Sequence, residues 1–336
     1  MLVLSFVSTF CWKLIFFSRA NSRIYIFFSA ATLFLLSVLR SPEEGIDIPN
    51  YINHFDRLSA ESFEVVLLLA ASGELRDPVF WLFTLAMAKL GLDPWVWISS
   101  ISFLFVLSVS RFVQKHSDFP LLSFVLMISL GYLGFSYSGL RQTVALSIVI
   151  ISLSFLLEGR KSWFLVGVLL ASLFHFSAIS CILFLFANIK LRLYHYVVGV
   201  VIALILGVFL GSHIRALIGV VGGQQYSGYM ERDVALNFTG VFVYLLIFSF
   251  CLTRLKQVGS RWSSAPLLYN ALFIGFGFQC LSLVVAEMFR VAMYFNIVSL
   301  ILVGWVLISY ESRLFRSLAY LSIMGACIAL FVVPRI

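Results

Sequence analysis

The chain has 336 residues, of which 62% are hydrophobic and 11% are charged, and its mean hydropathy is +1.05. An ordinary soluble domain is about 25% charged, so a soluble fold of this length would expose more apolar surface than its core could hide. The composition therefore predicts an all-α, polytopic integral membrane protein. The net charge is +8, and the basic residues lie mostly in short gaps between apolar runs. This pattern indicates orientation in a membrane rather than binding to nucleic acid.

Apolar runs long enough to cross a bilayer recur along the whole chain. A spanning helix needs about 20 residues, and the sequence predicts eleven such helices, or twelve if the shorter run at 78–92 also crosses. We expect them to form a single membrane domain, 1–336. The predicted spans are 2–17, 24–39, 95–113, 119–137, 140–157, 162–187, 196–213, 238–254, 266–285, 289–309 and 317–333.

Two gaps between the predicted spans are long. The segment 40–77 carries eight of the fifteen acidic residues, and 211–237 is polar and rich in glycine. The basic gaps should be cytoplasmic, which makes both long segments extracytoplasmic loops. The number of spans does not keep every basic gap on the cytoplasmic side if 78–92 crosses the membrane or if 162–187 crosses it once. A re-entrant or broken helix in these segments would restore the parity of the spans. Long polar loops in a compact fold usually carry function.

Polar residues at membrane depth are expensive, which makes them the best functional candidates. Arg141 and Gln142 open the predicted span 140–157 at its outer end. A guanidinium suits phosphate oxygens, although an arginine that merely snorkels to the headgroups is an equal alternative. His175 lies between two phenylalanines within 162–187. It is a candidate general base, and a packed histidine bonded to a neighbouring helix is the competing interpretation.

Two further groups lie at the expected outer surface. Glu287, Arg290 and Tyr294 share one face of a helix. Arg290, oriented by Glu287, would bind an anion, or the two charges would simply neutralise each other. Asp47 and Tyr51 lie in the first long loop, where carboxylates and rings suit sugar binding or general-base chemistry. A solvated acidic loop is the alternative for most of its acids. Tyr229, in the second long loop, is a further candidate sugar contact.

Several of these residues occur in an order that resembles a known family. The matching elements are Asp47-x-x-x-Tyr51, Asp77-Pro78-Val79-Phe80, Gly139-Leu140-Arg141-Gln142-x-x-Ala145, Phe174-His175-x-Ser177-Ala178 and Arg290-x-x-x-Tyr294. This order resembles the EpsG/Wzy-type bacterial polysaccharide polymerases, the integral-membrane O-antigen polymerase family, over about residues 40–310. Asp77 is a departure, because a glutamate is associated with that family position.

The resemblance implies a GT-C-like fold and a membrane glycosyltransferase of the bacterial inner membrane. Such an enzyme transfers a growing glycan from one undecaprenyl diphosphate carrier to a lipid-linked repeat unit at the outer leaflet, with an active site facing the periplasm or exterior. Metal independence, the absence of a cofactor and a separate chain-length regulator are also implied. In this scheme Arg141 and Arg290 bind the departing diphosphate, and His175, or secondly Asp47, is the base.

Other functions remain open from the sequence. An O-antigen ligase would share the arginines and the histidine. A flippase of lipid-linked oligosaccharide would need a hydrated cationic passage, whereas the candidate charges gather at one face. A membrane acyltransferase would leave the acidic outer loop without a purpose. Sugar identity, linkage and oligomeric state cannot be read from the chain.

Overall fold

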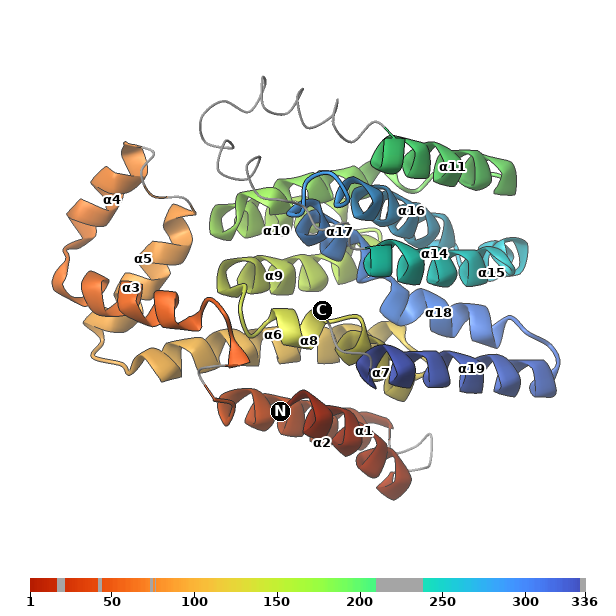
Figure 1. Ribbon diagram of the computed structural model, residues 1–336, viewed down its shortest axis with the longest axis horizontal. Helices are drawn as coiled ribbons and strands as arrows, with labels where there is room; N and C mark the ends of the chain where they lie inside the picture. Colours follow the sequence, from red (N-terminus) through yellow and green to blue (C-terminus); the bar gives the residue numbers. More distant parts are fainter. Residues whose placement is uncertain (17–21, 42–43, 73–74, 76, 210–237, 333–336) are drawn as a thin grey trace. The chain divides into compact units, whose positions relative to one another are not determined.

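The structure, a computed structural model, describes residues 1–16, 22–41, 44–72, 75, 77–209 and 238–332. All regular elements in this part of the chain are helices (Figure 1), which confirms the all-α prediction. The chain divides into two compact units, Met1–Ile179 with Ser317–Ile336, and Ser180–Arg316. The expectation of a single membrane domain, 1–336, stays a prediction.

The first unit is built around two long helices, α6 (Pro94–His116) and α9 (Leu140–Leu157), which run side by side in the same direction. Helix α2 packs on α6, α10 packs on α9, and α1 lies against α2 and α7. The other helices of this unit are α1 (Leu2–Ile15), α2 (Ser22–Val38), α3 (Ile48–Ala60), α4 (Phe63–Ala71), α5 (Pro78–Lys89), α7 (Pro120–Ser129), α8 (Tyr132–Phe135), α10 (Lys161–Phe174) and most of α19 (Arg313–Val332).

The contact between α9 and α10 is unusually close at one glycine. A Cβ atom added to Gly167 of α10 would lie 2.7 Å from Cβ of Ser152 on α9, nearer than Cβ atoms approach one another. Ser152 is buried and its hydroxyl donates to the carbonyl of Ile148 at 2.7 Å. Only glycine therefore lets the two helices approach this closely.

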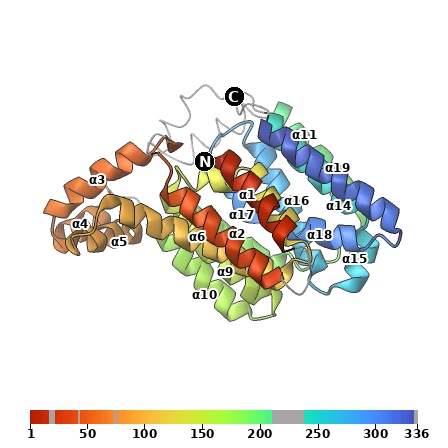
Figure 2. The same cartoon turned by 90° about the horizontal axis from the view of Figure 1, so that it is seen from below.

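The segment 40–77, expected as a loop, contains two helices in its described part. In α3 the buried residues Ile48, Tyr51, Phe55 and Leu58 recur at helical spacing, whereas Asp56 and its neighbours on the opposite face are exposed. The buried face joins one apolar cluster with residues of α5, α6 and α9. Figure 2 shows α3, α4 and α5 together beside the N-terminal end of α6. Asp56 of α3 and Glu64 of α4 are therefore carried on a helical layer that is anchored in the core.

The second unit is organised around α16 (Ala265–Leu281), which packs against α11 (Leu193–Phe209), α14 (Phe238–Leu252) and α17 (Met288–Asn296). Asn270 of α16 accepts a hydrogen bond from the Tyr196 hydroxyl at 2.6 Å and donates to the carbonyls of Ala187 and Ile189. Its remaining helices are α15 (Leu255–Arg261) and α18 (Ser299–Ile308). The predicted second loop, 211–237, lies outside the described residues.

Uninterrupted spans are fewer than the eleven or twelve expected. Among the described residues, three helices are long and apolar enough to cross a membrane, and the bent pairs α14–α15 and α17–α18 raise this number to five. Eight shorter apolar helices of 10–17 residues account for most other predicted spans. The predicted span 119–137 is split into α7 and α8 at Gly131, which has a φ of 86°. The predicted run 162–187, where the parity of the spans allowed a re-entrant or broken helix, is broken, because α10 ends at Phe174 and a 3-10 helix, η3 (Phe176–Phe186), follows.

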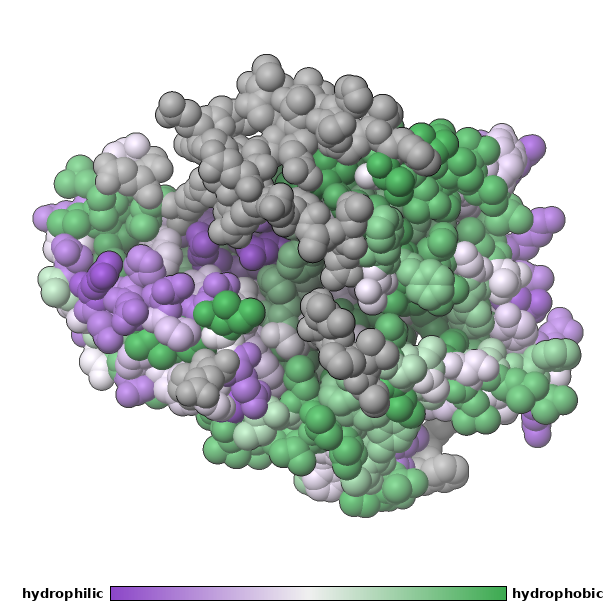
Figure 3. All heavy atoms as spheres, in the orientation of Figure 1, coloured by the Kyte–Doolittle hydropathy of each residue, from purple (hydrophilic) through white to green (hydrophobic). Residues whose placement is uncertain are grey.

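Apolar side chains are exposed along both units. Figure 3 shows them over α1 and α2 and again over α11, while hydrophilic residues gather over α3. Exposed examples are Leu14, Phe27, Val197, Val201 and Ile205. Water would not tolerate continuous apolar faces of this kind, and lipid covers them at no cost in polar groups. The surface therefore agrees with a membrane protein.

Candidate active site

Asp77 lies at the centre of a polar cluster in the first unit. It is the N-cap residue of α5, and its φ of 57° and ψ of 58° place it in the left-handed region, which only this one described residue other than glycine occupies. The following Pro78 starts the helix and disfavours the right-handed conformation for the residue before it. A left-handed aspartate costs about 1–3 kcal/mol of strain, which the surrounding contacts must offset.

The carboxylate of Asp77 accepts three hydrogen bonds from residues distant in sequence. Oδ2 accepts from Nη1 of Arg141 at 2.9 Å and from Nδ1 of His175 at 3.0 Å. Oδ1 accepts from the backbone N–H of Phe176 at 3.1 Å. The side chain of Asp77 is 6% exposed, so this carboxylate is buried with both of its oxygens satisfied. It ties the start of α5 to the start of α9 and to the junction of α10 with η3.

The break in the predicted span 162–187 occurs at His175. This residue is extended, with a φ of −157° and a ψ of 112°, and α10 ends directly before it. The backbone N–H of Phe176, at the start of η3, has no carbonyl one turn earlier to bond. The Asp77 carboxylate replaces that acceptor and brings a negative charge to the start of η3. A helix break and a buried carboxylate therefore support each other.

His175 is oriented by this contact in the way expected of a general base. An ionised carboxylate only accepts hydrogen bonds, so Nδ1 of the ring carries the proton. In the neutral ring this leaves the lone pair on Nε2, which has no hydrogen-bond partner among the described residues. The side chain is 20% exposed. The ring therefore has one nitrogen held by Asp77 and the other available to a ligand.

Arg141 is anchored on two sides in the first turn of α9. Besides its bond to Asp77, its Nε donates to the hydroxyl of Tyr51 at 3.4 Å. Its guanidinium carbon lies 6.0 Å from the ring centroid of Trp81 on α5. The side chain is 30% exposed, so a ligand can reach part of it. Pairing with Asp77 compensates its charge in part, so Arg141 is not the isolated cation that the sequence pattern suggested.

The pKa of Asp77 lies below its ordinary value. Burial alone would raise it, because burial penalises the charged form. The hydrogen bond and the charge of His175, the charge of Arg141 and the N–H of Phe176 together outweigh burial and lower the pKa. Asp77 is therefore ionised at neutral pH and remains a hydrogen-bond acceptor for its partners.

A family comparison bears directly on this arrangement. The model of the EpsG family matches residues 23–334, nearly the whole chain. The chain belongs to the EpsG family. Membership of the EpsG family supports a polysaccharide polymerase-type, glycosyltransferase-like role in a membrane, in agreement with the resemblance seen in the sequence. Neither a search of curated proteins nor a search of solved structures found a match.

Two more of the predicted site residues lie near the cluster in this EpsG family chain. Tyr51 contacts Arg141 directly and is buried against Phe80 and Trp97. Gln142 follows Arg141 and is 2% exposed, with its side chain in the interior of the unit. These residues lie close together because α3 and α9 enter the same apolar cluster.

The remaining predicted residues lie elsewhere. Asp47 is the N-cap residue of α3, and its carboxylate has no hydrogen-bond partner among the described residues. Glu287 is the N-cap residue of α17 in the second unit, which also contains Arg290 and the fully buried Tyr294. The expected convergence of Arg141 and Arg290 on one ligand therefore stays a prediction. Tyr229 lies outside the described residues.

Asp77 is the main residue that the candidate list omitted, although it belongs to the motif that carries the resemblance. The signal in the sequence was Asp77-Pro78 directly before an apolar run, which is typical of a helix start. A second omission is Arg40, which is 3% exposed. Its guanidinium carbon lies 4.5 Å from the ring centroid of Tyr137 and 5.5 Å from that of Trp95. In the described part of the chain, no group of three or more His, Cys, Asp or Glu is arranged for a metal ion.

Proposed function

We propose that this EpsG family protein is a polysaccharide polymerase that transfers a glycan between lipid diphosphate carriers. The donor is a glycan on an undecaprenyl diphosphate, and the acceptor is the non-reducing-end sugar of a repeat unit on a second carrier. The reaction takes place at the outer leaflet of the bacterial inner membrane and uses no nucleotide sugar. Family membership supports the polymerase class, and the polar cluster around Asp77 supports the chemistry.

The single observation that carries the proposal is the shared oxygen of Asp77. One atom, Oδ2, contacts both the imidazole of His175 and the guanidinium of Arg141. A glycosyl transfer to a hydroxyl needs a base for the acceptor and positive charge for the leaving group. The cluster supplies both functions within one hydrogen-bonded group, and a purely structural ion pair would not need the histidine.

The step balances with these residues. The acceptor hydroxyl attacks the anomeric carbon of the donor, a new C–O bond forms, and the bond from that carbon to the diphosphate breaks. Nε2 of His175 takes the hydroxyl proton, and Asp77 stabilises the resulting imidazolium through Nδ1. The released carrier diphosphate gains one negative charge, which the guanidinium of Arg141 stabilises. Later transfer of the proton to solvent or to the diphosphate restores the base.

Aromatic side chains next to the cluster suit the sugars. The ring of Trp81 on α5 has its centroid 6.0 Å from the guanidinium carbon of Arg141 and 5.1 Å from the ring centroid of His54 on α3, to which it is tilted. Rings of this kind pack on apolar sugar faces, and exposed carboxylates such as those of Asp56 on α3 and Glu64 on α4 accept hydrogen bonds from hydroxyl groups. The acidic helical layer is therefore our candidate for the acceptor side of the site.

Further parts of the proposal come from the sequence and its resemblance. Arg290, oriented by Glu287, is expected to assist at the diphosphate, and Tyr294 and Tyr229 to contact the ligand. Asp47 is the alternative base, and it is the weaker candidate because its carboxylate has no hydrogen-bond partner among the described residues that would orient it. Metal independence and a separate chain-length regulator stay predictions.

The decisive experiment compares Asp77→Asn with Asp118→Asn in cells that lack the native gene. Both changes remove one carboxylate in the first unit, but Asp118 is exposed between α6 and α7 and outside the cluster. We expect Asp77→Asn to leave single repeat units and no long glycan on a gel, with the variant present in membranes at the normal amount, and Asp118→Asn to leave long glycan intact. Long glycan from Asp77→Asn would refute the proposed role of the cluster. Loss of all glycan from the lipid A core would indicate a ligase. Precursor trapped on the cytoplasmic side of the membrane would indicate a flippase.

A further inference from the structure

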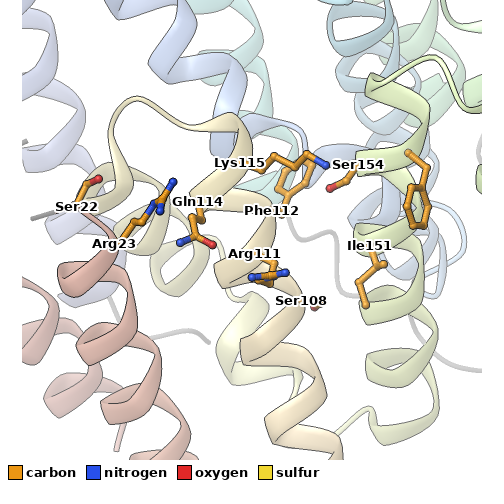
Figure 4. A pocket seen from close by; sticks show the side chains of 10 residues that line it. Ser22, Arg23, Ser108, Arg111, Phe112, Gln114, Lys115, Ile151 and Ser154 are labelled. Carbon is orange, nitrogen blue, oxygen red and sulfur yellow. The ribbon is translucent and has the colours of Figure 1, made fainter. Parts of the chain in front are cut away.

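A cavity with basic side chains in its lining lies in the first unit, at the end remote from the Asp77 cluster. It has a volume of about 680 Å³ and is lined by α2, α6 and α9 (Figure 4). On α9, Ser154 of this cavity lies thirteen residues beyond Arg141, which corresponds to about 20 Å along the helix axis. The cavity is therefore separate from the cluster around Asp77, and the proposed transfer reaction does not use it.

The charge of this cavity is strongly positive. Arg23, Arg111 and Lys115 line it, and no acidic residue does so within the described part of the chain. Lys115 forms an ion pair with Glu158, which lies outside the lining. Neither Arg23 nor Arg111 has an ion-pair partner among the described residues. Two positive charges on neighbouring helices thus face one space without compensation.

The polar groups converge from three helices. Figure 4 shows Arg23 of α2 next to Gln114 of α6, and Lys115 extending from α6 toward Ser154 of α9. The hydroxyls of Ser22 and Ser108 also line the cavity. Guanidinium, ammonium and hydroxyl groups are donors that match the acceptor oxygens of a phosphate group.

One wall of the same cavity is apolar. Phe112 and Phe155 contribute rings, and Ile151 of α9 is 39% exposed. A free phosphate ion has no apolar atoms that could pack against this wall, whereas the glycerol and upper acyl carbons of a phospholipid would cover it. The cavity also lies at the end of the unit where the basic gaps gather, and such ends attract anionic lipids at the membrane surface.

We propose that this cavity binds the phosphate of an anionic phospholipid. Arg111 and Arg23 hold the phosphate oxygens from two sides, Lys115 and the serine hydroxyls complete the donor set, and Ile151 and Phe155 contact the lipid chain. The bound lipid holds α2, α6 and α9 together at the end remote from the Asp77 cluster. The source of the phosphate is the lipid rather than a soluble anion because of the apolar wall.

The test uses the full chain, purified in a neutral detergent, and three probes. Phosphatidylglycerol and phosphatidylcholine are titrated separately as mixed micelles, and sodium phosphate is titrated at an ionic strength matched with sodium chloride. The readout is the midpoint of thermal unfolding, from which an apparent affinity follows. We expect phosphatidylglycerol to raise the midpoint well above the effect of phosphatidylcholine, and sodium phosphate to give a smaller rise.

Variants then locate the effect. Arg111→Gln should weaken the apparent affinity for phosphatidylglycerol about fivefold, which is the expected contribution of one basic residue near an anionic headgroup. Arg23→Gln, on another helix, should act in the same way and serves if Arg111→Gln does not fold. Lys161→Gln removes an exposed cation at the same end of the unit but outside the cavity; it should change the affinity less than twofold.

Each remaining outcome decides the proposal. Equal protection by phosphatidylglycerol and phosphatidylcholine would overturn it, and so would an equal loss in Lys161→Gln, which would indicate diffuse attraction. Full protection by sodium phosphate alone would overturn the lipid as the source and assign the site to soluble phosphate. Asp77→Asn should retain normal affinity for phosphatidylglycerol, so failure of the polymerase proposal and failure of this one are distinguishable.

Discussion

Nδ1 of His175 lies 3.0 Å from Oδ2 of Asp77, although 98 positions separate the two residues in the chain. The contact fixes which ring nitrogen carries the proton and turns Nε2 outward. If this nitrogen takes the acceptor proton, His175→Gln should lower turnover about 100-fold or more and leave the apparent KM within about threefold. The measurement is polymer formation from purified lipid-linked repeat units. His195→Gln, an exposed histidine of the second unit, is the matched control and should keep normal turnover.

Asp77 should also make the folded protein sensitive to acid. Its pKa is lowered on folding, so its contribution to the free energy of unfolding is complete above the ordinary aspartate value of about 3.9 and disappears as the pH falls through the lower folded value. Asp77→Asn should therefore unfold about 1–3 kcal/mol more easily at pH 6. The difference from the wild type should shrink below about pH 4. Thermal unfolding in detergent between pH 3 and pH 7 measures this, and a difference that grows toward acid would contradict it.

Arg141→Lys keeps a positive charge but loses the planar guanidinium group with its several N–H donors. A lysine cannot bond Asp77 and Tyr51 together and still present donors to a diphosphate. We expect turnover to fall about 10- to 100-fold, because loss of a charge-stabilising donor costs on this order. Arg57→Lys, an exposed arginine of α3, should have no effect. Wild-type turnover in Arg141→Lys would show that the charge alone is sufficient.

Gly167→Ala tests the close contact between α9 and α10. Its added methyl group would lie 2.7 Å from Cβ of Ser152, so the helices must separate. Overpacking of this kind costs about 1–3 kcal/mol of unfolding free energy, measured by thermal unfolding in detergent. Gly325→Ala on α19 meets no atom within 4 Å and should be neutral or slightly stabilising. Ser152→Gly in the Gly167→Ala background should recover part of the loss.

The sequence predicted the helix that carries Arg141 almost to the residue, since α9 spans Leu140–Leu157 and the expected span was 140–157. A long, strongly apolar run between two polar gaps is the most reliable signal that a sequence offers. The same signal did not locate the break within 162–187, because no proline or glycine lies directly before His175. Only the parity of the spans indicated that a re-entrant or broken helix could occur there. That break depends on Asp77, a residue of another helix, and no local pattern reports such a contact.

The acidic segment 40–77 contains helices that the prediction of an extracytoplasmic loop did not include, and its side of the membrane stays a prediction. Ile48, Tyr51, Phe55 and Leu58 have the three- and four-residue spacing of an amphipathic helix, but the many charges obscured this periodicity. The candidate site was predicted in part for the same reason: Arg141, His175 and Tyr51 were recognised singly from residue type, but the carboxylate that joins two of them was visible only in the folded chain.

The layer of α3, α4 and α5 is attached to the rest of its unit at the chemically active end. Since Asp77 begins α5 and holds both Arg141 and His175, a tilt of this layer would turn the imidazole and shift the guanidinium in one concerted movement. Docking of a sugar chain on the acidic surface would then adjust the machinery beneath it. In a glycosyltransferase of the proposed kind, such coupling would keep the donor bond out of alignment while the acceptor surface is empty, which would limit hydrolysis of that bond.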